Sequence, residues 1–418
     1  MLRKVFDHEL YRQHTQGIDL VLIPPLPQGF RVAAVHAGLK KVTAREDVAI
    51  VMSDTPAVAA GVYTTNLICA APVVFDRSRT PGIDFQAIVI NSGNANACTG
   101  QRGMSDAQSM ASLVAKHCGV SDRSVLVLST GIIGEFLPME KIALGIGMAA
   151  NQLGAESESV LSVCRGMMTT DTRAKLYGEY IEIESRRITI FGMAKGAAMI
   201  GPRMATMLGV ILTDAVLSPE DAQQLLIEAT DVSFNCVSVD GHMSTNDTVL
   251  LLANGQTGGK PLAGDDLKRF SKSLTATCES LAKQIAEDGE GATHSIRIDV
   301  SGCQTREDAR KVARTIADSP LVKTAIAGAD PNWGRIVSAA GYSGVAFAPE
   351  RIQLRLNGTL LYSHAAPVGF DAEAVSQSIS ATRETHIEVD LGDGTATIRF
   401  WSSDLTAEYV RLNADYHT

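Results

Sequence analysis

The sequence lacks the cysteine pattern of a disulfide framework. Its 418 residues include seven cysteines, an odd number, and no two of them form a Cys-x-x-Cys pair. Small disulfide-stabilised proteins usually carry an even number of cysteines at regular spacings. The scattered cysteines therefore predict a reduced, intracellular protein.

Long apolar runs and an excess of basic charge are also missing. No stretch approaches the roughly 18 apolar residues of a membrane span, and the first residues have no apolar core of signal-peptide type. Lys and Arg number 37 against 46 Asp and Glu, a net charge of −9. A nucleic-acid-binding face needs the opposite sign. We expect a cytoplasmic protein that binds neither membranes nor nucleic acid.

Several common catalytic motifs are absent as well. The sequence contains no Gly-x-Ser-x-Gly nucleophile elbow, no phosphate-binding Walker loop, no His-Glu-x-x-His zinc motif and no dinucleotide-binding glycine fingerprint. The histidines are isolated, so their spacing does not define a Ser-His-Asp arrangement. Any catalytic chemistry must come from other residues.

The chain is long enough for two domains and reads as mixed α/β (α+β). Buried strands are predicted at 46–54, 85–93 and 295–302, and hairpins at 178–196, 351–362 and 386–400. Helices are predicted at 105–119, 217–235, 264–287 and 305–322, and a short strand with a polar end at 406–418. A domain boundary near residue 290 divides the chain into 1–289 and 290–418.

Two polar loops are candidate ligand-binding sites. "VDGHMSTNDT" carries Asp240, His242 and Asp247, which could be metal ligands, but calcium loops need a denser ladder of carboxylates, so a polar turn is favoured. "DGEGATH" is glycine-rich, yet its acidic residues would repel a phosphate. Glu290 in that loop is better suited to an amine, and a plain helix end is an equally good interpretation.

A third segment, "STGIIGE", places Thr130 and Gly131 just past a predicted strand. Donors at such a turn can stabilise a developing oxyanion, although an ordinary turn is the commoner structure. In "KGAAMIGPRMATMLGVILTDA", Thr206 opens a strand-like run. A threonine that gains its own free α-amine by self-cleavage becomes a competent nucleophile. Taken alone, this stretch favours a threonine of the core.

Longer motifs favour the interpretation of Thr206 as a nucleophile, because they resemble those of the ornithine acetyltransferase / glutamate N-acetyltransferase family. The resemblance runs in order along almost the whole chain. It is carried by "NSGNANACTG", "STGIIGEFLPMEKI", "MMTTDTRAK", "KGAAMIGPRMATMLGVILTDA", "SFNCVSVDGHMSTNDT", "EDGEGATH", "SPLVKTAIAGADPNWGRI" and "YVRLNADYHT".

The resemblance implies a role for each matching residue. Ala205–Thr206 is the self-cleaved bond, which gives an α chain 1–205 and a β chain 206–418 with Thr206 as the nucleophile. Thr130 and Gly131 form the oxyanion hole. The residues implied to contact substrate are Thr169, Lys195, Thr206, Glu290, Asn413 and Thr418.

The resemblance also implies an αββα-type sandwich related to N-terminal-nucleophile hydrolases, with a smaller second α/β domain. The expected reaction is ping-pong transfer of acetyl from N2-acetylornithine to glutamate in arginine biosynthesis, within an α2β2 heterotetramer. No cofactor and no metal are expected, and acetyl-CoA remains open as a co-substrate. Alternatives are a self-processing amidohydrolase or aminopeptidase of related fold, and a non-catalytic metabolite-binding protein.

The sequence departs from the family pattern just before the expected cut. Ala197 and Ala198 stand where Ser-Gly or similar small pairs are common, and Gly201 and Arg203 also differ from the usual residues. The small-residue character is kept, so a close approach of the backbone is still expected. Arg203 adds a charge beside the cut and puts the rate of cleavage in question.

Overall fold

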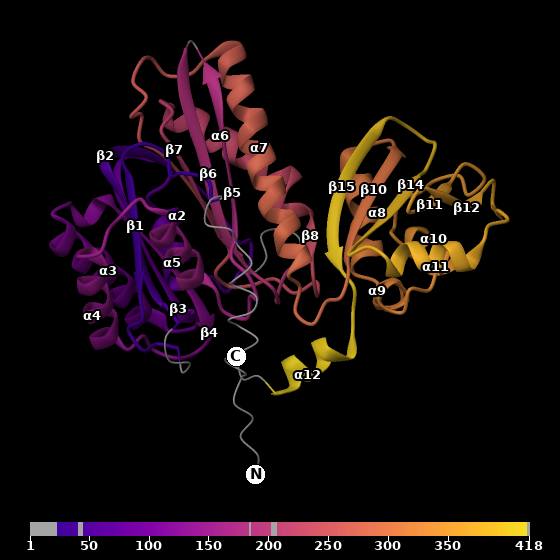
Figure 1. Ribbon diagram of the computed structural model, residues 1–418, viewed down its shortest axis with the longest axis horizontal. Helices are drawn as coiled ribbons and strands as arrows, with labels where there is room; N and C mark the ends of the chain where they lie inside the picture. The colour runs from indigo at the N-terminus through magenta and orange to yellow at the C-terminus, as the bar shows by residue number, and fades with distance from the viewer. Residues whose placement is uncertain (1–22, 41–44, 184, 202–206, 416–418) are drawn as a thin grey trace.

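The computed structural model describes residues 23–40, 45–183, 185–201 and 207–415. The protein is built on two β-sheets with helices around them, which confirms the α/β class (Figure 1). The strands of the first sheet are β1 (Phe30–Val35), β2 (Val48–Tyr63), β3 (Gly82–Asn94), β4 (Val125–Ile132), β5 (Lys175–Ile183), β6 (Arg186–Lys195), β7 (Leu208–Thr213) and β9 (Thr248–Ala253). Their order is β4-β3-β2-β9-β7-β6-β5, with β1 also paired to β2.

The second sheet contains β8 (Val237–Ser238), β10 (Ser295–Cys303), β11 (Gln353–Leu356), β12 (Thr359–Ser363), β13 (Ala366–Pro367), β14 (Glu384–Asp390) and β15 (Ala396–Ser403). Its order is β13-β12-β11-β14-β10-β15-β8. The helices are α2 (Ala71–Arg77), α3 (Gly100–Cys118), α4 (Met139–Ala150), α5 (Ser157–Met167), α6 (Pro219–Val232), α7 (Gly264–Glu287), α8 (Arg306–Ala317), α9 (Pro320–Ala327), α10 (Trp333–Gly341), α11 (Ala372–Ser380) and α12 (Ala407–Asp415).

The first sheet folds over on itself through the long strand β2. The first part of β2 pairs with β3 and its last part with β9, and the register shifts between Met52 and Ala57. A register shift of this kind bends a strand and increases its twist. The two halves of the sheet consequently face each other across one apolar core, in which Ile90 and Leu128 of one half join Phe191 and Val210 of the other.

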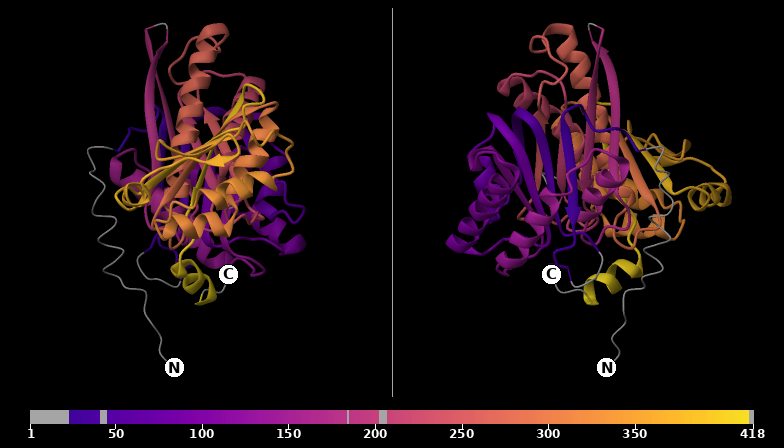
Figure 2. Two further views of the ribbon diagram at one scale, coloured as in Figure 1. Left: turned by 90° about the vertical axis from the view of Figure 1, so that its right-hand side faces the viewer. Right: turned by 60° about the vertical axis from the view of Figure 1, so that its left-hand side comes forward.

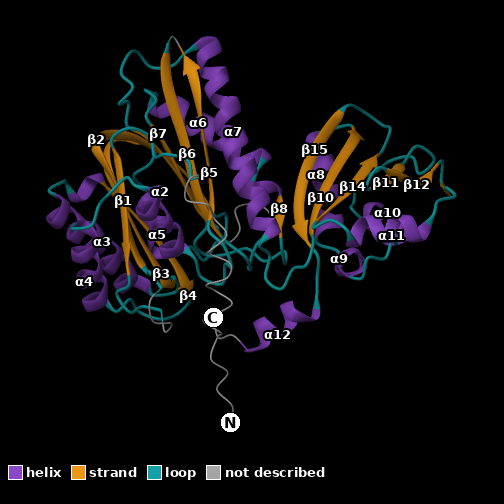
Figure 3. Cartoon of the chain, in the orientation of Figure 1, coloured by secondary structure: helices purple, strands orange, loops and turns teal. Residues whose placement is uncertain are grey.

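Helices cover both outer faces of this folded sheet. Helices α3 and α4 pack on the half that contains β1 to β4, and α6 and α7 pack on the half that contains β5, β6, β7 and β9. Figures 1 and 3 show the layers in sequence across the molecule. The αββα sandwich expected from the resemblance is therefore present.

The second sheet lies on the far side of α7. This helix contacts β5 and β6 on one side and β8 and β15 on the other, and α8 packs on β10 and β15. The left view of Figure 2 looks onto the part of the molecule that holds the second sheet. The two-residue strand β8 pairs with β15, so residues 237–238 join a sheet whose other strands begin at Ser295. Among the described helices, none has both the length and the hydrophobicity to cross a membrane.

The predicted helix ends and the predicted hairpin at 178–196 are confirmed, because these features depend on residues close together in the sequence. Helix α3 ends at Gly119, whose φ of 71° is the left-handed cap conformation that glycine favours. The hydroxyl of Ser218 accepts a hydrogen bond from the backbone N–H of Asp221 at the start of α6. The predicted hairpin at 178–196 is formed by β5 and β6, with Ile181 opposite Ile188.

Two predictions near the C-terminus are wrong. The expected hairpin at 386–400 does not form, because β10 lies between β14 and β15, parallel to one and antiparallel to the other. The expected strand after residue 406 is helix α12, whose first turn is capped by a hydrogen bond from the Glu408 N–H to the Thr406 hydroxyl. Pairing between distant strands and local capping decide these two cases, and alternation along the sequence does not reveal either of them.

Candidate active site

Thr130 and Gly131 lie near the carboxyl end of β4, beside β3. Thr130 is 4% exposed. Gly131 has a φ of +134°, and a Cβ atom added there would lie 2.3 Å from the carbonyl carbon of Gly93. Only glycine allows the two backbones to approach so closely. The position of Gly131 is thus fixed by packing of the main chain.

Buried amide and hydroxyl side chains hold this end of β4. The Ser129 hydroxyl donates to Asn91 Oδ1 at 2.6 Å. The side-chain amide of Asn246 donates to the carbonyl oxygens of Ser129 and Ala95, at 2.8 and 2.6 Å. Fully satisfied buried networks of this kind rigidify a site. The backbone that carries Thr130 is therefore held on both sides.

Lys195 reaches Thr130 from the opposite half of the sandwich. It is the last residue of β6 and is 2% exposed. Its Nζ atom donates to the Thr130 hydroxyl oxygen at 3.1 Å. Burial lowers the pKa of Lys195, an effect that Lys175 reinforces and that Asp171, Asp247 and Glu290 oppose. The structure thus brings together two of the predicted site residues that are far apart in the sequence.

A buried ion cluster lies next to Lys195. Lys175 is fully buried and its ammonium contacts the carboxylates of Asp171, at 2.7 Å, and Asp288. Burial alone would raise the pKa of Asp171, but Lys175 and Lys195 bring it well below its usual value. Burial alone would lower the pKa of Lys175, but the two carboxylates raise it. Asp171 and Lys175 are therefore held in their charged forms.

Asp171 connects two of the predicted site residues, Thr169 and Lys195. Its Oδ2 atom accepts a hydrogen bond from the backbone N–H of Thr169 at 3.0 Å. Its Oδ1 atom accepts one from the N–H of Gly196, which follows Lys195, at 2.6 Å. Thr169 and Lys195 are consequently placed relative to each other by one carboxylate.

Glu290 and Asn413 meet near the same loop. The Asn413 side-chain amide donates to Glu290 Oε2 at 2.8 Å, and the Glu290 N–H donates to the Ala197 carbonyl at 2.9 Å. Burial raises the pKa of Glu290, and nearby Asp240 and Asp171 add to that effect. Helix α12 therefore extends from the second sheet back to the segment that follows Lys195.

The expected cleavage site, Ala205–Thr206, and the terminal residue Thr418 lie outside the described residues. The first described residue after the cut is Met207, whose backbone N–H donates to Asp247 Oδ1 at 3.0 Å. Asp247 is fully buried, and burial raises its pKa well above the usual value. Its Oδ2 atom has no hydrogen-bond partner in the described part of the chain.

The loop with Asp240, His242 and Asp247 is built as a turn. The carboxylate of Asp240 accepts hydrogen bonds from the backbone N–H groups of Met199 and Ile200, at 2.6 and 2.9 Å. Across the described ranges, no group of three His, Cys, Asp or Glu side chains has the arrangement of a metal site. These carboxylates are engaged with the backbone that precedes and follows the predicted cut.

Sequence reasoning assigned no role to most of the residues that hold this site, and it considered Asp247 only as a possible metal ligand. Asp171, Lys175 and Asp288 form the buried ion cluster, and Asn246 and Asp247 bind the ends of β4 and β7. Asp171 and Lys175 are four residues apart, a spacing that is equally common in exposed ion pairs. Their burial, which gives the cluster its importance, is a property of the tertiary structure.

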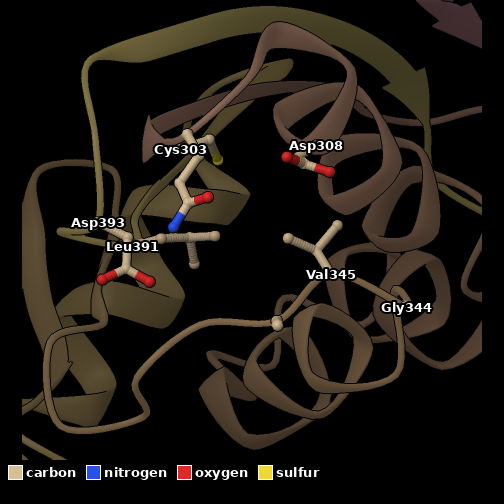
Figure 4. Close-up of a pocket in the computed structure, with 8 residues that line it drawn as sticks. Cys303, Asp308, Gly344, Val345, Leu391 and Asp393 are labelled. Atoms are coloured by element: carbon tan, nitrogen blue, oxygen red, sulfur yellow. The ribbon is translucent and has the colours of Figure 1, made fainter.

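A separate cavity of about 210 Å3 lies in the region of the second sheet (Figure 4). Asp308 and Asp393 line it, together with Cys303 and Val345. The Asp308 carboxylate already accepts a hydrogen bond from the hydroxyl of Thr305, which caps the start of α8, and Asp393 pairs with Arg351 at 2.7 Å. None of the predicted site residues lines this cavity, so it does not define the active site.

An αββα sandwich in which a Thr-Gly pair meets a buried lysine is the arrangement of an acyl-transfer enzyme. Comparison with known proteins gives the family. Residues 31–418 match the model of the ArgJ family. The chain is 46% identical over 396 residues to the arginine biosynthesis bifunctional protein ArgJ of Rhodopirellula baltica, with 94% of this chain and 96% of that protein covered.

A second relative agrees. The protein of the same name from Geobacter sulfurreducens is 45% identical over 395 residues, covering 94% of this chain and 99% of that protein. A crystal structure of ArgJ from Bacillus halodurans is 41% identical and covers 50% of this chain and 98% of that chain, with a TM-score of 0.49. The present chain belongs to the ArgJ family, and it is an acyltransferase of arginine biosynthesis, as the sequence predicted.

Proposed function

We propose that the protein transfers the acetyl group of N2-acetylornithine to glutamate through an acetyl-Thr206 intermediate. The supporting observation is that contacts around residues 195–197 bring distant parts of the chain together. Lys195 contacts Thr130, Asp171 links Thr169 to Gly196, and the Glu290 N–H donates to the Ala197 carbonyl. Asn413 joins this group through Glu290. Residues of both proposed fragments contribute to it. One active site therefore needs the α chain 1–205 and the β chain 206–418 to stay together.

In the proposed first half-reaction, the Thr206 hydroxyl attacks the acetyl carbonyl of N2-acetylornithine. The α-amine released by cleavage of Ala205–Thr206 takes the hydroxyl proton and returns it to the leaving amine of ornithine. The Thr130 hydroxyl and the Gly131 N–H stabilise the oxyanion of the tetrahedral intermediate. Glutamate then attacks the acetyl ester, and N-acetylglutamate leaves with Thr206 regenerated.

The same group of residues suits two amino-acid substrates. An α-carboxylate needs hydrogen-bond donors, which Lys195, Thr169 and Asn413 supply. The cationic side chain of ornithine needs an anion, for which Glu290 and the terminal carboxylate of Thr418 are suited. Transfer between two amides of similar energy needs no coenzyme, and acetyl-CoA is proposed only as an additional donor for glutamate.

Two further properties belong to this proposal. The functional unit is an α2β2 heterotetramer in which each α chain stays bound to its β chain. The enzyme works in the reducing cytoplasm, in line with seven cysteines that are all free in the structure. Gel filtration with multi-angle scattering and separation of the chains under denaturing conditions test the assembly.

Intact mass and acetyl transfer test the function directly. The purified protein is expected as two fragments in place of one chain of 44.4 kDa, and incubation with N2-acetylornithine is expected to add one acetyl group to the 206–418 fragment. Thr206→Ala should abolish both cleavage and transfer. The control variant Thr315→Ala, on α8, should be cleaved and should transfer acetyl like the wild type. Full transfer activity in the Thr206→Ala variant would contradict the assignment of the nucleophile.

Dependence on the acceptor separates this function from its nearest alternative. A transferase releases ornithine in step with the formation of N-acetylglutamate, while an amidohydrolase releases acetate at the same rate with or without glutamate. Assay with acetyl-CoA as the sole donor decides whether the protein has the second activity.

A further inference from the structure

The contact between Lys195 and Thr130 constrains the direction of a proton. An ammonium group carries three N–H donors and no acceptor, so the Thr130 hydroxyl must accept from it. The hydroxyl proton consequently points away from Lys195 and stays available for a different acceptor. The 3.1 Å contact crosses the inside of the sandwich, from the end of β6 to the end of β4.

We propose that Lys195 is a positioning residue that acts through Thr130, presenting the hydroxyl proton of Thr130 to the oxyanion of the reacting acetyl group. This inference rests on the proposed function and goes beyond the expected contact between Lys195 and the substrate carboxylate. A hydroxyl that accepts a hydrogen bond from a cation is also a stronger donor, because consecutive hydrogen bonds polarise one another.

The surroundings of Lys195 hold it in place for this role. The peptide that follows it is fixed by the hydrogen bond from the Gly196 N–H to Asp171. Asp171 is in turn paired with the buried Lys175, which also contacts Asp288 at the end of α7. The ammonium of Lys195 is therefore carried on a rigid strand end whose position is set by a buried ion cluster.

The carboxyl groups around Lys195 oppose the effect of burial on its charge. Burial lowers the pKa of Lys195 and Lys175 adds to that, whereas Asp171, Asp247 and Glu290 raise it. Of these three, Asp171 is held in its charged form and lies beside Lys195 through the Gly196 N–H. The hydroxyl of Ser129, the residue before Thr130, donates to Asn91 instead.

A double-mutant cycle tests the inference. Lys195→Met, Thr130→Ala and the double variant are compared with the wild type for kcat and KM with N2-acetylornithine and glutamate, per mole of cleaved chain. Loss of an oxyanion donor reduces kcat by about 10²–10³-fold. We expect Lys195→Met to lower kcat at least about tenfold in the wild-type background and to add less than about twofold to Thr130→Ala, because coupled residues are not additive.

Lys268→Met, which changes an exposed lysine on α7, should leave kcat unchanged. Equal effects of Lys195→Met in both backgrounds, or an effect confined to KM, would overturn the inference in favour of a carboxylate contact alone. If Lys195→Met is not cleaved, Lys195→Gln replaces it. Because the amide keeps an N–H donor, a smaller loss of kcat is expected; a loss that disappears in the Thr130→Ala background supports the inference, and an equal loss in both backgrounds overturns it.

Failure of the proposed function would give a different result from failure of the role inferred for Lys195. In that case the wild-type protein itself would show no acetyl transfer from N2-acetylornithine. An active wild type with additive Lys195 and Thr130 substitutions would reject only the role of Lys195 described here.

Discussion

The backbone N–H of Met207, the residue before β7, donates to the buried carboxylate of Asp247 at 3.0 Å. Asn246, the residue before Asp247, donates through its side-chain amide to the carbonyl of Ser129 at 2.8 Å. Ser129 is the residue before Thr130. Two consecutive side chains thus bind the strand that follows the proposed cut and the strand that carries the proposed oxyanion donors. Their relative placement is set by residues 246 and 247.

Removal of the Asp247 carboxyl should destabilise the protein. Asp247→Ala leaves the N–H of Met207 buried without its acceptor, which costs about 1–3 kcal/mol. Asp247→Asn keeps an oxygen acceptor, and because burial disfavours the carboxylate form, it should cost less. Thermal unfolding measures both, with the exposed Asp265→Ala as the control. Equal midpoints for Asp247→Ala and the control would contradict this expectation.

Gly131→Ala should impair activity more than stability alone explains. The added Cβ would lie 2.3 Å from the Gly93 carbonyl carbon, so the ends of β3 and β4 must separate. We expect kcat to fall by about 10²–10³-fold, as for the loss of an oxyanion donor. Gly119→Ala is the matched control, since it has a positive φ but no atom within 4 Å of the added Cβ. A normal kcat in Gly131→Ala would rule out the oxyanion role.

Lys175→Met should destabilise the protein in a way that depends on pH. The substitution leaves Asp171 and Asp288 buried without their cation, and breaking a buried pair costs about 3–5 kcal/mol. The pKa of Asp171 is lowered by folding, so its stabilising contribution is present above its ordinary value of 3.8 and is lost on acidification below it. The pKa of Lys175 is raised, so its contribution is present below 10.5 and is lost at higher pH.

Thermal midpoints of the wild type and Lys175→Met should therefore differ most between pH 3.8 and 10.5 and converge outside that window. The exposed pair of Lys268 and Asp265 serves as the comparison, because such a pair contributes only about 0–1 kcal/mol. A difference that is the same at every pH would mean that lost packing, and not charge, explains the effect.

Glu290→Gln should weaken the binding of N2-acetylornithine. Replacing a charge-assisted hydrogen bond by a neutral one costs up to about 1.5–3 kcal/mol, so KM for this substrate should rise about tenfold or more. Because burial raises the pKa of Glu290, KM of the wild type should begin to rise already above pH 4.5 on acidification. Steady-state kinetics measure both, with the exposed Glu408→Gln as the control. An unchanged KM would remove Glu290 from substrate binding.

Signals carried by neighbouring residues predicted much of the fold. The cap at Ser218, the stop at Gly119 and the hairpin of β5 and β6 are local features, so short stretches of sequence reveal them. The pairing of β10 between β14 and β15 is not local, because it joins strands separated by helices and loops. No alternation of apolar residues indicates which distant strand will lie beside another.

The sequence by itself determined the family and named Thr130, Lys195 and Glu290, because long motifs in fixed order leave few alternatives. Only the tertiary structure decided how these residues act together. The fold of β2 brings two halves of one sheet face to face, and Lys195 then meets Thr130 across the core. Burial gives that contact its strength, since in the low-dielectric interior a charge and its partners interact far more strongly than in water.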